Sequence, residues 1–149
     1  MTSTVLEAAP LTNALHAWLE GLALRPVGKL QSPPNRPFPY HVLYSVPGGG
    51  YDGPPLSGPD EDATVVYQVN TVALDPDAAG DNADHVRRLM LGRVPATGAF
   101  EVPAPSVDGW RIIDRRPDGG TPGAEYSGAP PKRVFTIAER FVLVVTPNP

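Results

Sequence analysis

Histidine has the widest chemical range of the residues in this chain, because its imidazole ligates metals and moves protons near neutral pH. The three histidines are His16, His41 and His85. Each lies in or beside a segment of periodic apolar residues, and no two of them have the spacing of metal ligands within one element. A metal site would need carboxylates from distant parts of the chain, so we interpret the histidines as surface or packing residues.

The carboxylates and glycine-rich loops give no better-defined chemistry. Asp60-Glu61-Asp62 is the densest acidic run, and such a run either binds a divalent cation or, more commonly, is a solvated loop end. Gly48-Gly49-Gly50 is followed neither by Gly-Lys-Ser/Thr nor by an expected helix, so it is not a phosphate-binding loop. No pair among the 16 acidic residues stands out for acid–base catalysis, and no nucleophile elbow occurs. We therefore predict a protein that is not an enzyme, with no catalytic residues, cofactor or metal.

Two basic pairs, Arg115-Arg116 and Lys132-Arg133, flank a segment rich in glycine and proline. Such pairs suit an acidic partner or a phosphate backbone, and they also occur simply as solvated residues at strand ends. The net charge of −4 and the lack of a basic block argue against sequence-independent nucleic-acid binding. The longest clean apolar run, Phe141 to Val145, is too short to cross a membrane.

The first element that positions these residues is a helix over roughly Leu11 to Leu24, where apolar residues recur at intervals of three and four. Thr12 or Asn13 is a suitable cap for its start, and Pro26 ends it. The stripe expected to face the core is Leu11, Leu15, Trp18, Leu19 and Leu22.

A second helix is expected to begin after Asp75, with this residue as the N-cap and Pro76 in the first helical position, and to stop at Gly92. Aspartates occupy its first turns and arginines its last, which complements the helix dipole. The stripe expected to face the core is Ala79, Ala83, Val86, Leu89 and Met90.

The remaining periodic segments alternate as strands do. The predicted strands are Tyr40 to Val46, Ala63 to Leu74, Trp110 to Arg115 and Arg133 to Thr146. An extended connector from Val27 to Pro39 precedes the first strand, and long loops are expected from Pro47 to Asp62 and from Arg116 to Lys132. The last strand is apolar on both faces in its later half, which is typical of a central, doubly covered strand.

The element order α, β, β, α, β, β predicts an α+β fold in one domain spanning residues 1–149. The simplest layered arrangement is a mostly antiparallel mixed sheet with two helices packed on one face and long Gly/Pro-rich hairpin loops. The first two strands are expected to form a large antiparallel hairpin, and Trp110 is expected in the core with Trp18.

Several segments together resemble a known family. These are the helix Leu-Thr-Asn-Ala-Leu-His-Ala-Trp-Leu, the run Pro37-Phe38-Pro39-Tyr40-His41-Val42-Leu43-Tyr44, and the loop Pro47-Gly48-Gly49-Gly50-Tyr51-Asp52-Gly53-Pro54. A strand with Val-Tyr-Gln-Val and a helix with Asp-His-Val-Arg-Arg follow. The pattern, from about Leu11 to Val145, is similar to the tail terminators and neighbouring minor tail proteins of siphoviruses, the long-tailed phages, that infect actinobacterial hosts.

The resemblance implies a structural virion protein, assembled in the host cytoplasm and located at the neck end of the phage tail. In that family, subunits close into a homo-hexameric ring that caps the tail tube, stops its polymerisation and presents a docking surface to the head-tail connector or head-closure protein. The implied partners are the chain itself, the tail tube protein, that connector and the tape measure protein. Genome DNA passes through such a ring without being read by sequence.

A closed ring repeats one heterologous contact, and long loops are natural arms for gripping a neighbour. We therefore place the subunit or tube interface in the two long loops, with aromatic and apolar residues as anchors. The residues expected there are Tyr51, Leu56, Asp60, Glu61, Arg115, Arg116, Tyr126, Lys132 and Arg133.

Three other functions remain open from the sequence. The first is another neck, head-closure or tail-completion subunit, because related folds recur across these roles. The second is a small-ligand-binding or enzymatic α+β domain, which would need a concave pocket with converging polar groups. The third is a nucleic-acid-binding module, which the acidic net charge disfavours and salt-sensitive DNA affinity would support.

Overall fold

A computed structural model describes residues 6–35, 37–51, 62–119, 123–128 and 133–148. Its elements are α1 (Ala8–Leu22), β1 (Val27–Lys29), β2 (Tyr40–Tyr51), β3 (Ala63–Ala73), α2 (Pro76–Leu91), β4 (Trp110–Pro117), β5 (Ala124–Ser127) and β6 (Val134–Pro147). The sheet has the order β1-β2-β3-β6-β4, and β5 pairs with a further stretch of β6. Among these pairings β1–β2 is parallel and the others are antiparallel. The predicted α+β fold with a mostly antiparallel mixed sheet is therefore confirmed.

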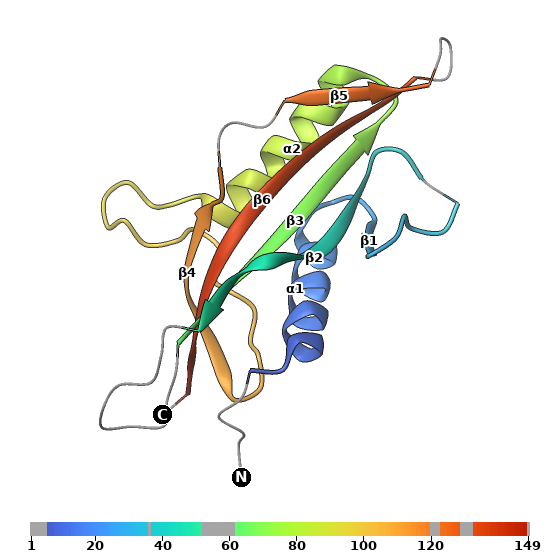
Figure 1. Cartoon of the computed structure of the whole chain (residues 1–149). Coiled ribbons are helices and arrows are strands. Elements are labelled where there is room, and N and C mark those ends of the chain that lie inside the picture. The colour runs from blue at the N-terminus through green and yellow to red at the C-terminus, as the bar shows by residue number, and fades with distance from the viewer. Residues whose placement is uncertain (1–5, 36, 52–61, 120–122, 129–132, 149) are drawn as a thin grey trace.

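Both helices cover the same face of the sheet, as predicted (Figure 1). Leu11, Leu15 and Leu19 of α1 are almost fully buried, and they share one apolar cluster with Val86 and Met90 of α2. The sheet contributes residues from β2, β3 and β6 to this cluster: Leu43, Tyr67, Val69, Phe141, Leu143 and Val145. Each fully buried aliphatic side chain of this size stabilises the fold by about 1.5–3 kcal/mol relative to an exposed one.

The hairpin of β2 and β3 is also confirmed, and its ladder runs from Tyr40 opposite Val72 to Tyr51 opposite Ala63. The expected loop begins too early, because β2 continues through Gly48–Gly50 to Tyr51. Between the pairs Val46–Val66 and Gly50–Thr64 the register shifts, since four steps on β2 match two on β3. The extra residues form a bulge in a Pro-Gly-Gly segment, which suits an edge strand.

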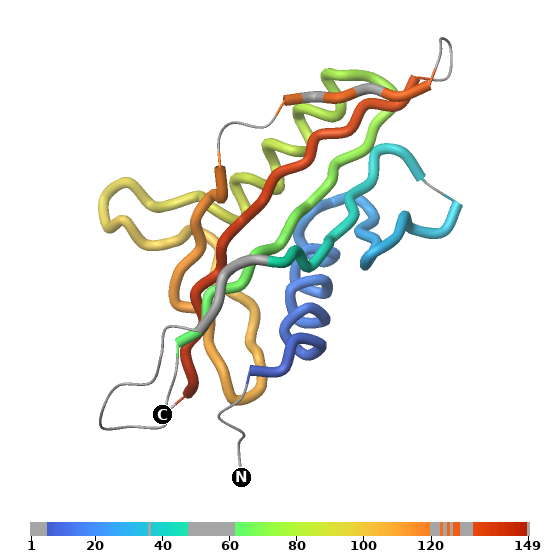
Figure 2. The backbone as a smooth tube through the Cα atoms, in the orientation of Figure 1, coloured from blue at the N-terminus to red at the C-terminus, as the bar shows by residue number. Residues whose placement is uncertain are grey.

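The long pair of β3 and β6 forms the middle of the sheet (Figure 2). Its ladder extends from Ala63 opposite Val145 to Ala73 opposite Phe135. β6 is central, as its apolar sequence predicted, but helices cover only one of its faces. On the other face Val142 lies opposite Val66 of β3, and both are nevertheless buried, with 7% and 8% of their surface exposed.

The helix ends test the expected caps. Asp75 caps α2 as predicted, with its Oδ1 accepting from the Ala78 backbone N–H at 2.8 Å, and Gly92 is the C-cap. In contrast, neither Thr12 nor Asn13 caps α1, which begins earlier, at Ala8. Pro10 stands in the first turn, where the missing N–H has no cost. The Thr12 hydroxyl instead contacts the Tyr67 hydroxyl at 2.8 Å.

Two short strands lie in segments that were expected to lack strands. β1 lies in the connector and runs parallel to the start of β2, while β5 lies in the loop before β6. β1 has 3 residues and β5 has 4. These lengths lie at or below the lower limit of the roughly four to eight residues over which alternation indicates a strand, so the pattern does not distinguish them from loops.

Candidate assembly surfaces

The two edges of the sheet are the first candidate contact surfaces. β1 pairs with β2 only at His41, Val42 and Leu43, so the described part of β2 beyond Leu43 pairs with β3 alone. At the opposite edge, among the residues that the structure describes, β4 pairs in a ladder with β6 alone. An unpaired strand edge offers backbone donors and acceptors to another chain. These two open edges lie at opposite ends of the strand order, as a head-to-tail contact requires.

Exposed apolar side chains lie near both edges. Leu24 and Leu30 flank β1 and are 82% and 60% exposed. On β4, Ile113 is 48% exposed and is the extra residue of a bulge between Ile112 and Asp114. Bulges turn a side chain away from the regular alternation of the strand. The exposed isoleucine is therefore a product of local backbone geometry.

The residues predicted as contacts do not gather in one patch. Arg116 lies on β4 opposite Val142, whereas Arg133 is exposed just before β6 begins. Eight or nine strand residues separate these positions along β6, which is roughly 30 Å. Tyr51 ends β2 opposite Ala63, and Tyr126 lies on β5 opposite Phe135. Leu56, Asp60, Glu61 and Lys132 lie outside the described residues.

Arg115 requires a correction, because its side chain is only 3% exposed and does not form a solvated surface pair with Arg116. Its guanidinium donates to the backbone oxygens of Leu89, at 3.3 Å, and Val102, at 2.6 Å. It also lies over the rings of Phe100 and Trp18, with centroids at 4.1 and 5.4 Å. Burial, and next the charge of Arg93, lower its pKa below the usual value. Arg115 therefore connects β4 to α1, to α2 and to the segment between α2 and β4.

The histidines are engaged in structural bonds. The Nε2 of His16 lies 2.7 Å from the Val27 oxygen, and the Nε2 of His85 lies 3.0 Å from the Leu22 oxygen. His41 is 1% exposed, and its Nδ1 lies 2.9 Å from the Thr71 hydroxyl. Within the described residues there is no group of three or more His, Cys, Asp or Glu residues that could hold a metal ion.

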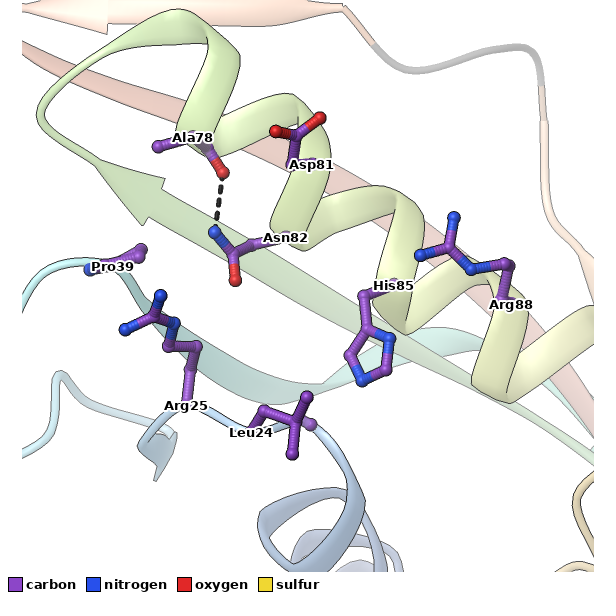
Figure 3. Close-up of a pocket in the computed structure, with 9 residues that line it drawn as sticks. Leu24, Arg25, Pro39, Ala78, Asp81, Asn82, His85 and Arg88 are labelled. Carbon is purple, nitrogen blue, oxygen red and sulfur yellow. Dashed lines mark hydrogen bonds between the residues drawn. The ribbon is translucent and has the colours of Figure 1, made fainter.

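A groove between the end of α1 and the exposed side of α2 is the feature that the sequence did not reveal (Figure 3). Its volume is about 510 Å³. Figure 3 shows Arg25 extending from the turn after α1 toward Asn82, while His85 extends from α2 toward Leu24. The other lining residues are Ala23, Pro39, Ala78, Asp81 and Arg88.

The groove has no sequence signal of its own, because its sides come from segments about fifty residues apart. From the sequence, Arg88 was interpreted only as one of the arginines that complement the helix dipole, and Arg25 was given no role. The bond from His85 to the Leu22 oxygen brings the two segments together. That contact depends on both helices packing on one face of the sheet.

Comparison with known proteins gives a likeness of fold. No family model matches the chain, and no curated protein matches it in sequence. A chain in the structure titled "Virion of native gene transfer agent (GTA) particle" is similar, with a TM-score of 0.57 and 14% sequence identity. The match covers 94% of this chain and 99% of that chain. In the part of the chain that the structure describes, no helix is long and apolar enough to cross a membrane.

Proposed function

We propose that this protein is a non-enzymatic structural component of a phage-like virion. The observation that carries this proposal is the likeness to a chain of a virion particle over almost the full length of both chains. An end-to-end likeness concerns the whole module rather than one shared motif. At 14% identity the likeness is one of fold. Because one fold serves many functions, the role in a virion is a proposal that needs the tests below.

Within that class, we propose the role of a tail terminator, the ring subunit that caps the tail tube, stops its growth and provides the docking surface for the head connector. The pattern of residues from Leu11 to Val145 favours this role. The two open sheet edges and the exposed apolar residues beside them suit a contact that repeats from subunit to subunit. The β2–β3 hairpin has a long ladder, from Tyr40 opposite Val72 to Tyr51 opposite Ala63, which suits an arm that reaches a neighbour (Figure 1).

The first test is the mass of the purified protein by light scattering, with negative-stain images of the same peak. A ring of about six subunits with a central hole is the expected result. A stable monomer that forms no ring, even with tail tubes present, would contradict the proposal and favour a ligand-binding or enzymatic domain.

Tail tubes then separate the terminator from another neck or tail-completion subunit. A terminator binds the end of a tube and prevents addition of further tube subunits, so tube length should stay constant after it is added. A head-closure or connector subunit forms a ring that leaves growth of bare tubes unchanged. Tube lengths measured in negative stain, with and without the protein, distinguish the two outcomes.

A further inference from the structure

The groove of Figure 3 carries positive charge that the described part of the chain does not neutralise. Arg25 and Arg88 line it, and none of the ion pairs between described residues involves either of them. Asp81 is the acidic residue in the lining, so the lining holds two permanent positive charges and one negative charge. Arginine forms strong, forked hydrogen bonds with carboxylates. The chemistry of the groove therefore suits an acidic ligand.

The positive charge of the groove also affects the pKa of His41, a buried residue near it. The pKa of His41 is lowered to about 4, first by burial and then by the charges of His85 and Arg25. Its Nε2 is buried and has no hydrogen-bond partner among the described residues. A carboxylate bound between Arg25 and His85 would offset their effect on this imidazole.

The rim of the groove is apolar, which suits a peptide better than a small inorganic anion. Leu24 is 82% exposed, and its backbone has a φ of 62°. A leucine seldom adopts a positive φ, and here that conformation follows the end of α1. Pro39 and Ala78 add further apolar surface. An acidic segment bound there would place carboxylates against arginines and its backbone against an apolar rim.

The chain carries a matching acidic segment, Asp60-Glu61-Asp62, at the other end of the β2–β3 hairpin. Asp62 directly precedes Ala63, which pairs with Tyr51, whereas Pro39 of the groove precedes Tyr40 at the opposite end of the ladder. The ladder of β3 spans 11 residues, which at the rise of a strand is roughly 35 Å. Asp60 is only two residues from Asp62, so the segment cannot reach the groove of its own chain.

We propose that the groove binds the acidic segment Asp60-Glu61-Asp62 of a second copy of this chain. This inference rests on the proposed ring, for which it names the two complementary surfaces. Because the segment and the groove lie at opposite ends of one hairpin, each copy offers one surface to each neighbour. Such a contact is heterologous and repeats until the ring closes.

The groove is tested first without any ring. A peptide covering residues 57–63 is added to ¹⁵N-labelled full-length chain with the substitutions D60N, E61Q and D62N, which leave the groove free of its own acidic segment. We expect the amide signals of Leu24 and Asn82 to shift with the acidic peptide and not with its amide counterpart. Added salt should weaken the effect. Equal shifts with both peptides, or none with either, would overturn the inference.

Charge reversal adds a matched control. R25E with R88E, introduced into the same chain, should weaken peptide binding by at least about tenfold. R111E with R140E changes the net charge equally at arginines outside the groove lining and should change binding by less than about twofold. Far-UV circular dichroism confirms that both variants fold. Equal loss of binding in both pairs would show a general charge effect and contradict a specific site.

Ring formation then distinguishes this inference from the proposed function. R25E/R88E and D60K/E61K should each abolish rings, and the chain with all four substitutions should regain them through reversed pairs. Rings formed by R25E/R88E as readily as by the unmodified chain would reject this contact and leave the terminator proposal standing. If the unmodified chain forms no ring with tail tubes, the proposed function fails, while the peptide titration still decides whether the groove binds acidic segments. If the groove binds an acidic segment of another virion protein but not the acidic segment of this chain, the inference that a second copy occupies the groove is wrong.

Discussion

Arg115 and Arg116 are neighbours in sequence with opposite environments, and the difference comes from the strand. Successive side chains of β4 point to opposite faces, so Arg115 enters the side of the sheet that packs on α2 while Arg116 is exposed. Arg115 keeps its charge in a buried place because two backbone oxygens and two aromatic rings surround its guanidinium. Among the described residues, Arg116 has one ion-pair contact, at 4.0 Å from Asp114.

We expect R115A to lower the free energy of unfolding by about 2–4 kcal/mol, because it leaves two backbone oxygens without their donor and empties a buried space. R116A is the matched control and should change it by less than about 0.5 kcal/mol, as exposed ion pairs usually do. Urea denaturation followed by tryptophan fluorescence measures both. Equal midpoints for the two variants would contradict the structural role of Arg115.

His41 should make stability depend on pH. Burial lowers the pKa of this imidazole in the folded protein to about 4, whereas the ordinary value for histidine is 6.5. The unfolded chain therefore binds the extra proton between these pH values, and the free energy of unfolding falls as the pH drops from about 6.5 to about 4. The total loss is on the order of 3 kcal/mol. Urea midpoints at intervals of pH should show it.

H41Q removes this titration, so its stability should change less over the same pH range. H16Q is the control, because His16 is partly exposed and its replacement leaves His41 in place. If the pH dependence of stability is unchanged in H41Q and reduced in H16Q, the titrating group is His16 and the prediction for His41 is wrong.

At the scale of elements, an ion pair connects α2 to β6 in the middle of the sheet. Arg87 of α2 contacts the carboxylate of Glu139 on β6, and the Glu139 side chain is only 8% exposed. Glu139 lies on the same face of β6 as Phe141 and Leu143, which belong to the core. A carboxylate in that position needs a cation, because an unpaired buried charge is expensive.

R87A should therefore destabilise the protein by about 3 kcal/mol, since it leaves Glu139 unpaired. R88A, one residue further on, removes an exposed arginine of the groove and should cost less than about 0.5 kcal/mol. Adding E139Q to R87A should recover part of the loss, because the remaining buried group is then neutral. A double variant less stable than R87A would show that the pair does not act as a unit. Thermal unfolding followed by circular dichroism measures all three.

The elements that could be predicted from sequence are those long enough to show a period. α2 has both cap signals and five buried apolar positions, and β3 and β6 alternate over 11 and 14 residues. β1 and β5 depend on a partner strand for their conformation, so a local pattern could not indicate them. The groove was missed for a similar reason, because Arg25 and His85 meet only after both helices have packed. The predicted exposure of Arg115 was wrong because the two aromatic residues around it come from segments far apart in the sequence.

At the scale of the whole molecule, the helical layer and the hairpin have separate tasks in the proposed ring. The core that holds the fold lies between the helices and β2, β3 and β6. The contact surfaces lie around this core: the groove near Pro39 and the open edges of β2 and β4.

Deleting Gly49 to Gly58 should leave a folded monomer that no longer closes rings. The ladder pairs from Tyr40–Val72 to Val46–Val66 remain, as does most of the β3–β6 ladder, so the free energy of unfolding should fall by no more than about 1–2 kcal/mol. The deletion draws Asp60 and Glu61 back toward β3 and shortens the arm that reaches a neighbour. A replacement of the same ten residues by a Gly-Ser segment of equal length is the control for length. Both variants keep Asp60-Glu61-Asp62, but only the Gly-Ser variant keeps the length of the arm. If the length of the arm is what matters, the Gly-Ser variant should still form rings. Light scattering gives the mass of each protein, and intact rings from the deletion would refute the role of the hairpin arm.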